Sequence, residues 1–270
     1  MPELPEVEVT RLGIAPHIEG QVIQQIHVHQ KQMRWPIPDE VHLAQSQVIT
    51  SVTRRAKYLF VHTAVGALVL HLGMSGKMRV VDSRLERKKH DHLEIDLASG
   101  KKLVLNDPRR FGSCLWQATN AEPLSLLKRL GPEPLTDEFD GARLFTLSRG
   151  KQSPVKTFIM DNAVVVGVGN IYANESLFNS GIDPRRAAGK ISKVRYATLS
   201  NNIKKVLENA IKQGGTTLRD FAQADGNPGY FAQHLHVYGR AGENCDVCAS
   251  IIRSKVIGQR NTFFCIKCQK

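Results

Sequence analysis

The first residues of the chain, Met1, Pro2 and Glu3, offer an unusual nucleophile. Removal of Met1 would leave Pro2 with a free secondary amine, and α-amino groups have pKa values of about 7.7 to 8.0, so a useful fraction is unprotonated near neutral pH. Attack of this amine on a sugar C1′ carbon would give a cationic iminium, which is an electron sink. Glu3 could donate or relay the proton. The competing interpretation is that Pro2 is only a stiff residue that opens the first helix.

Four of the five cysteines follow the pattern C-x2-C-x16-C-x2-C, namely Cys245, Cys248, Cys265 and Cys268. This spacing is typical of two zinc knuckles, and four thiolates close a tetrahedral site with no open position for water. The sequence therefore predicts one structural Zn²⁺ and no organic cofactor. Disulfides are the alternative, but a reducing compartment and C-x2-C pairs favour a metal. Cys114 stands apart in an apolar run and is predicted to be a buried thiol.

Between the knuckles the sequence predicts two short strands, Ile251–Ile257 and Thr262–Cys265, joined by a connection that contains Arg260. A zinc-clamped hairpin would hold Arg260 at its tip. A guanidinium in such a place suits forked contact with a phosphate. The alternative is an ordinary solvated turn residue.

The charge balance points to a polyanionic partner. The chain has 270 residues with 37 basic and 25 acidic side chains, a formal net charge of +12. Nucleic acid is the first candidate. No apolar stretch approaches the length of a membrane span, and no basic amphipathic helix or lipidation signal is present, so we expect no membrane partner and a soluble, cytoplasmic protein. Without heptads or another association signal, a monomer is expected.

The N-terminal part is predicted to form a helix followed mostly by strands. Pro5, Glu6 and Glu8 fit a helix start, and Pro16 is expected to kink or end that helix. From Val22 onwards alternating runs separated by turn residues predict a β-sandwich, with a short helix near residues 123–130 beside it. The fold class is therefore α+β.

The second half of the chain is predicted to be helical. Residues 134–150 are interpreted as a linker, followed by helices near 155–160, 173–179 and 192–213. Gly167 and Gly169 permit tight turns, and the helix that follows offers free N–H groups. Asn170 is therefore a candidate for phosphate binding.

The motifs together resemble one family. They are MPELPEVEV, GMSGKMRV, NDPRRFG, VVVGVGNIYANESLF, QGGTTLRDF, DGNPGYF, VYGRAGENCDVC and the closing TFFCIKCQK. In unbroken order from Pro2 to Lys270, they are similar to bacterial formamidopyrimidine-DNA glycosylases. The resemblance implies a catalytic β-sandwich domain (1–133), a helix-two-turn-helix DNA-binding domain with a lesion-capping loop (134–235) and a zinc ribbon (236–270).

The resemblance also implies an activity. It implies a nucleoid-associated bacterial repair enzyme that flips oxidised purines, such as 8-oxoguanine and formamidopyrimidines, out of double-stranded damaged DNA. Pro2 would then attack C1′, and β- and δ-elimination would cut the abasic strand.

The site residues carried over from the family fall into four groups. Glu3 would be the acid/base partner of Pro2, Lys57 would assist the elimination and bind phosphate, and Arg260 would bind phosphate and promote the δ step. The implied phosphate contacts further include His90, Arg109, Lys151 and Asn170. Met74, Arg109 and Phe111 would enter the duplex, with Arg109 facing the orphaned cytosine. Weaker candidates for placing the lesion or the sugar are Glu6, Glu175 and Tyr230.

Several of these residues also have a plainer interpretation. Met74 and Phe111 could be core residues, Arg109 an exposed turn residue, and the charged run around His90 a solvated face. The segment from Gln223 to Gln233, which resembles a lesion-capping lid, could be a simple connector. Two alternative functions stay open: an endonuclease VIII-like enzyme for oxidised pyrimidines, and a non-catalytic zinc-ribbon DNA-binding protein.

Overall fold

The computed structural model describes residues 2–214 and 235–270. The predicted lid, including Tyr230, lies outside the described residues. The chain divides into two compact units, one built from the residues up to Lys128 and one from Arg129–Lys212 with the C-terminal residues. The domain bounds at 133 and 235 stay a prediction.

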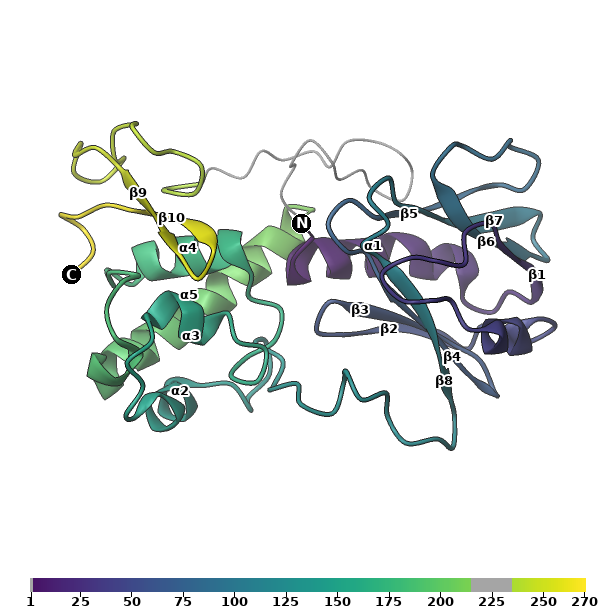
Figure 1. The fold of residues 1–270 in the computed structure, drawn as a ribbon, viewed down its shortest axis with the longest axis horizontal. Helices are drawn as coiled ribbons and strands as arrows, with labels where there is room; N and C mark the ends of the chain where they lie inside the picture. Colours follow the sequence, from purple (N-terminus) through teal and green to yellow (C-terminus); the bar gives the residue numbers. More distant parts are fainter. Residues whose placement is uncertain (1, 215–234) are drawn as a thin grey trace. The chain divides into compact units, whose positions relative to one another are not determined.

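The first unit consists of a helix and two antiparallel four-stranded sheets (Figure 1). Helix α1 (Leu4–Ile18) begins after Glu3, and Pro16 is in its last turn, two residues before its end. One sheet has the order β1-β6-β7-β5 and the other the order β2-β3-β4-β8. The strands are β1 (Ile23–Val28), β2 (Ser51–Arg55), β3 (Tyr58–His62), β4 (Gly66–His71), β5 (Lys77–Asp82), β6 (Asp91–Leu97), β7 (Lys101–Asn106) and β8 (Ser113–Ala118), and a 3-10 helix η1 spans Asp39–Ala44. The predicted β-sandwich and α+β class are confirmed.

One apolar core holds the two sheets and α1 together. Leu59 on β3 pairs with Leu70 on β4, which pairs with Cys114 on β8, and all three side chains are fully buried. They belong to the same cluster as Ile14 and Ile18 of α1. The prediction of a buried Cys114 is confirmed, and burial raises the pKa of its thiol to about 12.

The helix predicted near residues 123–130 is wrong, because this segment forms turns. The Gln117 side chain binds its backbone: Oε1 accepts from the Leu124 N–H (2.8 Å), and Nε2 donates to the Glu122 carbonyl (3.2 Å). Such local side-chain bonds compete with helical ones. Leu124 and Leu127 pack against Phe60 and its neighbours, so their apolar pattern reflects this contact.

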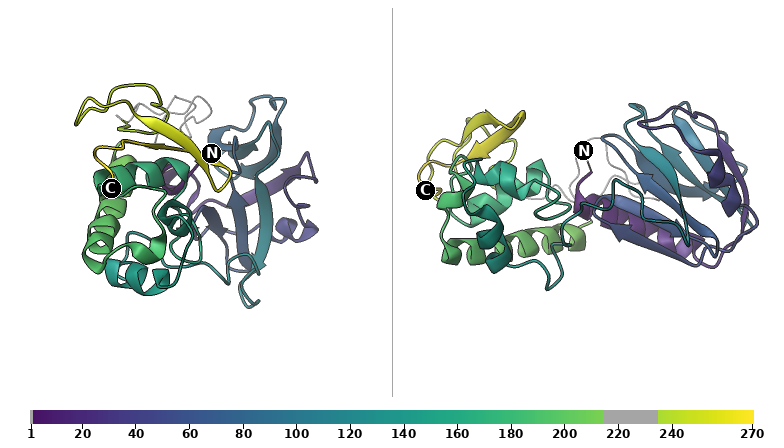
Figure 2. Two further views of the ribbon diagram at one scale, coloured as in Figure 1. Left: turned by 60° about the vertical axis from the view of Figure 1, so that its left-hand side comes forward. Right: turned by 60° about the horizontal axis from the view of Figure 1, so that its bottom comes forward.

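The second unit is a helical cluster that carries a β-hairpin (Figure 2). It contains α2 (Gly141–Ser148), α3 (Val155–Ile159), α4 (Asn170–Asn179), η2 (Ala188–Lys190), α5 (Lys193–Lys212), β9 (Arg253–Ile257) and β10 (Arg260–Phe264). Helices α2 and α4 both pack on the long α5, and β10 lies against α4. None of the helices in the described ranges is long and apolar enough to cross a membrane.

The predicted linker 134–150 is wrong in part, because it contains α2. Asp140 caps this helix and accepts a hydrogen bond from the Arg143 N–H (2.7 Å). At Gly141 an added Cβ would lie 2.4 Å from the Ala197 Cα, so the glycine allows α2 to pack directly on α5. An Asp-Gly pair is typical of a turn, whereas here it is an N-cap followed by a close helix contact.

Candidate active site and metal centre

Pro2 lies just before α1 and is partly exposed, as a nucleophile must be. Glu3 is the N-cap of the helix and is 2% exposed. Its backbone N–H donates to the buried Glu6 carboxylate (Oε2, 2.8 Å), which completes a reciprocal capping box. The capping box thus fixes the backbone directly after Pro2, at the residue before α1 begins. The chemical roles of these residues stay predictions.

Lys57 occupies the tight turn between β2 and β3. The residue before it, Ala56, has a φ of 53°, a left-handed conformation that costs energy for a residue with a side chain. Lys57 directly precedes Tyr58, which pairs with His71, the last residue of β4. The charges of Arg34 and Lys57 contribute to lowering the pKa of that imidazole. Arg34 and His71 were not identified from the sequence, where nothing distinguishes them from ordinary surface and strand residues.

His71 is held as a neutral ring. Burial, followed by the charges of Arg34 and Lys57, lowers its pKa from the ordinary 6.5 to about 4. Its Nδ1 accepts a hydrogen bond from the Gly73 N–H (3.0 Å), which an imidazolium could not do. The ring also packs against Tyr58, with centroids 4.9 Å apart. The loop that carries Met74 therefore rests on an unprotonated histidine.

Lowering the pH from 7 to 4.5 is expected to destabilise the wild-type chain more than the His71→Gln variant. In the unfolded chain His71 takes up a proton near pH 6.5, but in the folded chain only near pH 4. The folded state binds fewer protons in this window, so its stability falls with the pH, by up to about 3 kcal/mol. Urea unfolding at both pH values measures the difference. Parallel pH dependences of the two proteins would contradict it.

The residues expected to enter the duplex lie on two surface loops. Met74 is partly exposed, Arg109 is exposed and Phe111 is 44% exposed. The Arg109 guanidinium lies 4.9 Å from the Phe111 ring centroid. Phe111 is therefore not a core residue, and the core interpretation of its side chain does not hold. His90 is partly buried, and its carbonyl accepts from the Asp107 N–H (3.0 Å), so it is fixed beside these loops rather than lying on a free charged run.

In the second unit, Asn170 and Arg260 lie next to each other. Asn170 is the first residue of α4, and its Nδ2 donates to the Asn261 carbonyl (3.0 Å). Arg260 is the first residue of β10, after a two-residue turn in which Gly258 and Gln259 have φ values of 56° and 60°. The connection predicted as four residues therefore has two. Arg260 still follows the turn directly.

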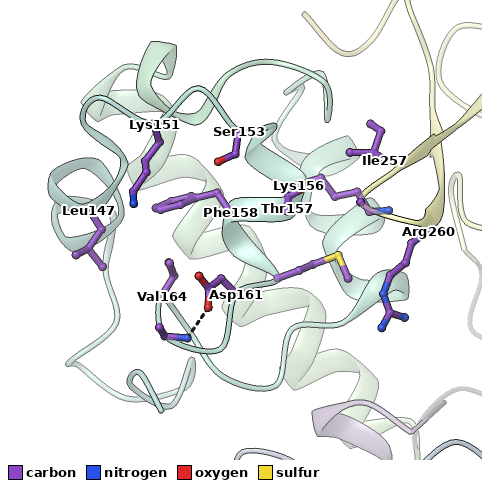
Figure 3. A pocket seen from close by; sticks show the side chains of 13 residues that line it. Leu147, Lys151, Ser153, Lys156, Thr157, Phe158, Asp161, Val164, Ile257 and Arg260 are labelled. Atoms are coloured by element: carbon purple, nitrogen blue, oxygen red, sulfur yellow. Dashed lines mark hydrogen bonds between the residues drawn. The ribbon is translucent and has the colours of Figure 1, made fainter. Parts of the chain in front are cut away.

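Lys151 and Arg260 line the same pocket, which has a volume of about 550 Å³ (Figure 3). They lie on opposite sides of it, and the other lining residues include the apolar Phe158 and Val164. The structure thus brings together three of the predicted phosphate contacts of this unit, since Asn170 is anchored to the residue after Arg260.

The hairpin that carries Arg260 is fixed by polar side chains missed in the sequence. Lys156 is 1% exposed, and its Nζ donates to Thr262 Oγ1 (2.7 Å) and the Asn261 carbonyl (3.2 Å). The fully buried Asn174 accepts from the Phe263 N–H (2.8 Å). In the sequence Lys156 is one of several basic residues between 149 and 156, and nothing indicates that it is buried.

Glu175 holds the backbone that leads into the zinc ribbon. Its buried carboxylate accepts hydrogen bonds from the N–H groups of His236 (2.8 Å), Val237 (3.0 Å) and Tyr238 (2.8 Å). Three such bonds occupy both oxygens. The structure therefore gives Glu175 an anchoring role, and its expected part in placing the lesion stays a prediction.

The four cysteines of the ribbon meet at one point. Their Sγ atoms all lie within 4.8 Å of one another, and Cys245 to Cys268 and Cys248 to Cys265 are 3.8 and 3.4 Å apart. A tetrahedral zinc site with bonds of about 2.3 Å needs sulfur separations of about 3.8 Å, whereas a disulfide needs about 2 Å. The arrangement fits Zn²⁺, which these four thiolates would hold with no open position. The zinc prediction is confirmed and the disulfide alternative is not.

Three regions of the chain match models of known protein families. Residues 1–114 match the formamidopyrimidine-DNA glycosylase N-terminal domain, residues 130–222 the formamidopyrimidine-DNA glycosylase H2TH domain, and residues 242–270 the zinc finger found in FPG and IleRS. The formamidopyrimidine-DNA glycosylase of Alteromonas mediterranea is 63% identical over 270 residues, which is the full length of both chains.

Solved structures of the same family match this chain over nearly its full length. The MutM (Fpg) protein of Thermus thermophilus matches with a TM-score of 0.89 and 36% identity over 99% of this chain and 98% of its own. The Lactococcus lactis Fpg in complex with DNA containing an abasic site matches with a TM-score of 0.91 and 32% identity over 99% of both chains. The chain therefore belongs to the formamidopyrimidine-DNA glycosylase family of zinc-finger enzymes that act on damaged DNA.

Proposed function

We propose that this chain excises oxidised purines, including 8-oxoguanine opposite cytosine and formamidopyrimidines, and then cleaves the abasic strand by β- and δ-elimination. The observation that carries the proposal is the accessible Pro2 directly before the buried Glu3 at the start of α1. The proposal applies to the form that lacks Met1, in which the Pro2 nitrogen is a free amine.

The proposed reaction proceeds through an iminium between the Pro2 nitrogen and C1′. The Pro2 nitrogen attacks C1′, the C1′–base bond breaks with its electron pair, and the departing base gains a proton, for which Glu3 is the proposed donor. The Pro2 nitrogen then loses its proton, and the C1′–O4′ bond breaks as O4′ takes up a proton, which opens the sugar ring and gives the iminium. The iminium acidifies C2′–H. Loss of that proton expels the 3′-phosphate, and a second proton loss expels the 5′-phosphate. Hydrolysis of the iminium releases the sugar fragment and restores Pro2.

The proposed DNA contacts on each unit are mainly basic. On the first unit they are Lys57, His90 and Arg109, and on the second Lys151, Asn170 and Arg260. Their charges would pair with backbone phosphates, so binding should weaken as salt rises. Arg109 would present N–H donors to O2 and N3 of the orphaned cytosine, which gives the preference for cytosine a chemical cause. Met74 and Phe111 would fill the space left by the flipped nucleotide.

Single-turnover assays on a panel of duplexes test this function. We expect excision of 8-oxoguanine opposite cytosine and strand cleavage that leaves phosphate at both ends of the gap. The same panel includes 8-oxoguanine opposite adenine and an oxidised pyrimidine. Preferential excision of the pyrimidine would favour the endonuclease VIII-like alternative. Binding without excision or scission would favour a non-catalytic DNA-binding protein.

A further inference from the structure

Asp107 directly follows β7, and its carboxylate is fully buried. The hydrogen bonds of this carboxylate all go to surface loops. Its Oδ1 accepts from Ser75 Oγ (2.7 Å) and the Arg109 N–H (3.3 Å), and its Oδ2 accepts from the Gly112 N–H (2.7 Å). These partners are a hydroxyl group and backbone N–H groups rather than a cation. The carboxylate thus joins residues 73–76 to residues 109–112.

The backbone of Asp107 adds a third segment to this junction. Its N–H donates to the His90 carbonyl (3.0 Å), and its carbonyl accepts from His92 Nε2 (2.8 Å) and the Arg110 N–H (3.2 Å). Every polar atom of the residue is therefore used. The residues joined in this way flank or include four side chains that the proposed function brings to the DNA: Met74, His90, Arg109 and Phe111.

The two loops are also in direct backbone contact. Gly73 has a φ of 63°, and a Cβ added there would lie 2.3 Å from the Phe111 carbonyl carbon. A Cβ on Gly112 would lie 2.7 Å from the His71 carbonyl oxygen and 3.1 Å from Asp107 Oδ2. Because both glycines are needed for this approach, the loops form one packed unit centred on Asp107.

We propose that Asp107 is a positioning residue for base flipping, which keeps the Met74 loop and the Arg109–Phe111 loop in one fixed arrangement. Met74 is the neighbour of Ser75, and Arg109 and Phe111 lie between the two ends of the 107–112 loop that the carboxylate closes. Met74 and Phe111 would fill the vacated space while Arg109 contacts the orphaned base, so the two loops must enter the duplex in one arrangement. This inference rests on the proposed function, because it assigns to Asp107 a part in that reaction.

The contacts of Asp107 also distinguish loop positioning from a general contribution to the stability of the fold. The side-chain bonds of Asp107 are made to loops, whereas the sandwich is held by the apolar cluster between its sheets. Loss of the carboxylate should therefore affect steps that need the inserted loops more than steps at the sugar. An abasic nucleotide has no base to unstack, so its cleavage depends less on insertion.

The test compares Asp107→Asn, Asp107→Ala and Ser75→Ala with the wild type on two substrates, 8-oxoguanine opposite cytosine and a preformed abasic site. We expect both Asp107 variants to lose on the order of 100-fold in the excision rate, because small misplacements in the site are costly. Abasic cleavage should stay close to the wild-type rate. Ser75→Ala removes one of the three side-chain bonds and should fall between. Asp137→Asn, at an exposed position in the second unit, is the matched control and should change neither rate.

The deciding quantity is the ratio of the 8-oxoguanine excision rate to the abasic cleavage rate. A smaller folded fraction lowers both rates equally and leaves this ratio unchanged. A 2-aminopurine next to the orphaned cytosine reports loop insertion by its fluorescence and should show delayed insertion in the variants. Unchanged excision, or a parallel loss on both substrates, would overturn the proposal. If the Asp107 variants do not fold, Ser75→Ala decides the question by the same ratio. A wild-type chain that cleaves neither substrate would instead overturn the proposed function.

Discussion

Substitution of Pro2 by glycine, or retention of Met1, is expected to lower base excision on the order of 10³-fold or more, as loss of a catalytic nucleophile does. Retained Met1 converts the Pro2 nitrogen into an amide with no basic lone pair. Pro2→Gly leaves only a primary amine without the ring that holds the nitrogen in place. Single-turnover excision of 8-oxoguanine, measured beside DNA binding by fluorescence anisotropy, checks this.

Binding should survive these changes, because the proposed phosphate contacts lie elsewhere on the chain. Pro5→Ala is a suitable control, since it alters the first turn of α1 and leaves the Pro2 nitrogen unchanged. Its excision rate should stay near that of the wild type. A Met1-retaining form as active as the processed form would contradict a role for the Pro2 amine.

Removal of zinc is expected to unfold the ribbon and to weaken binding to damaged DNA at least about tenfold, or about 1.4 kcal/mol. Structural zinc contributes about 10 to 16 kcal/mol to the folding of small zinc domains. Arg260 lies on the strand between the knuckles, so its position depends on the four thiolates. Metal content, anisotropy before and after chelation, and the Cys265→Ser variant measure the effect.

Thiol counting provides an internal control for the same experiment. Chelation should expose Cys245, Cys248, Cys265 and Cys268 to a thiol reagent, while Cys114 stays unreactive until the first unit unfolds. Its thiol is fully buried, with a pKa of about 12. Unchanged DNA binding by the metal-free protein would show that the ribbon does not place Arg260.

Local patterns explain which elements could be predicted. The strands of the sandwich were found because their turn residues and apolar runs are continuous in sequence. Helix α2 is not evident from the sequence, because Gly141 permits close packing against Ala197, which is far away along the chain. The supposed helix near residues 123–130 was wrong because the bonds of the Gln117 side chain favour turns there.

The same distinction applies to the site. The four cysteines form two local pairs with a regular spacing, so the metal centre was predictable. Asp107 and Ser75 are 32 residues apart, and Lys156 and Thr262 are 106 apart. Nothing in either neighbourhood of the sequence indicates its partner. Residues that position the site therefore become visible only when the fold brings them together, whereas residues with distinctive chemistry, such as Pro2, can be identified earlier.

Borohydride reduction during reaction with a duplex that contains 8-oxoguanine opposite cytosine tests whether Pro2 is the nucleophile. The reductant converts the iminium between the Pro2 nitrogen and C1′ into a stable amine, and peptide mass mapping then locates the bond. We expect one covalent protein–DNA adduct, on Pro2 of a chain that lacks Met1. An adduct on a lysine, or none under conditions where the base is excised, would contradict it.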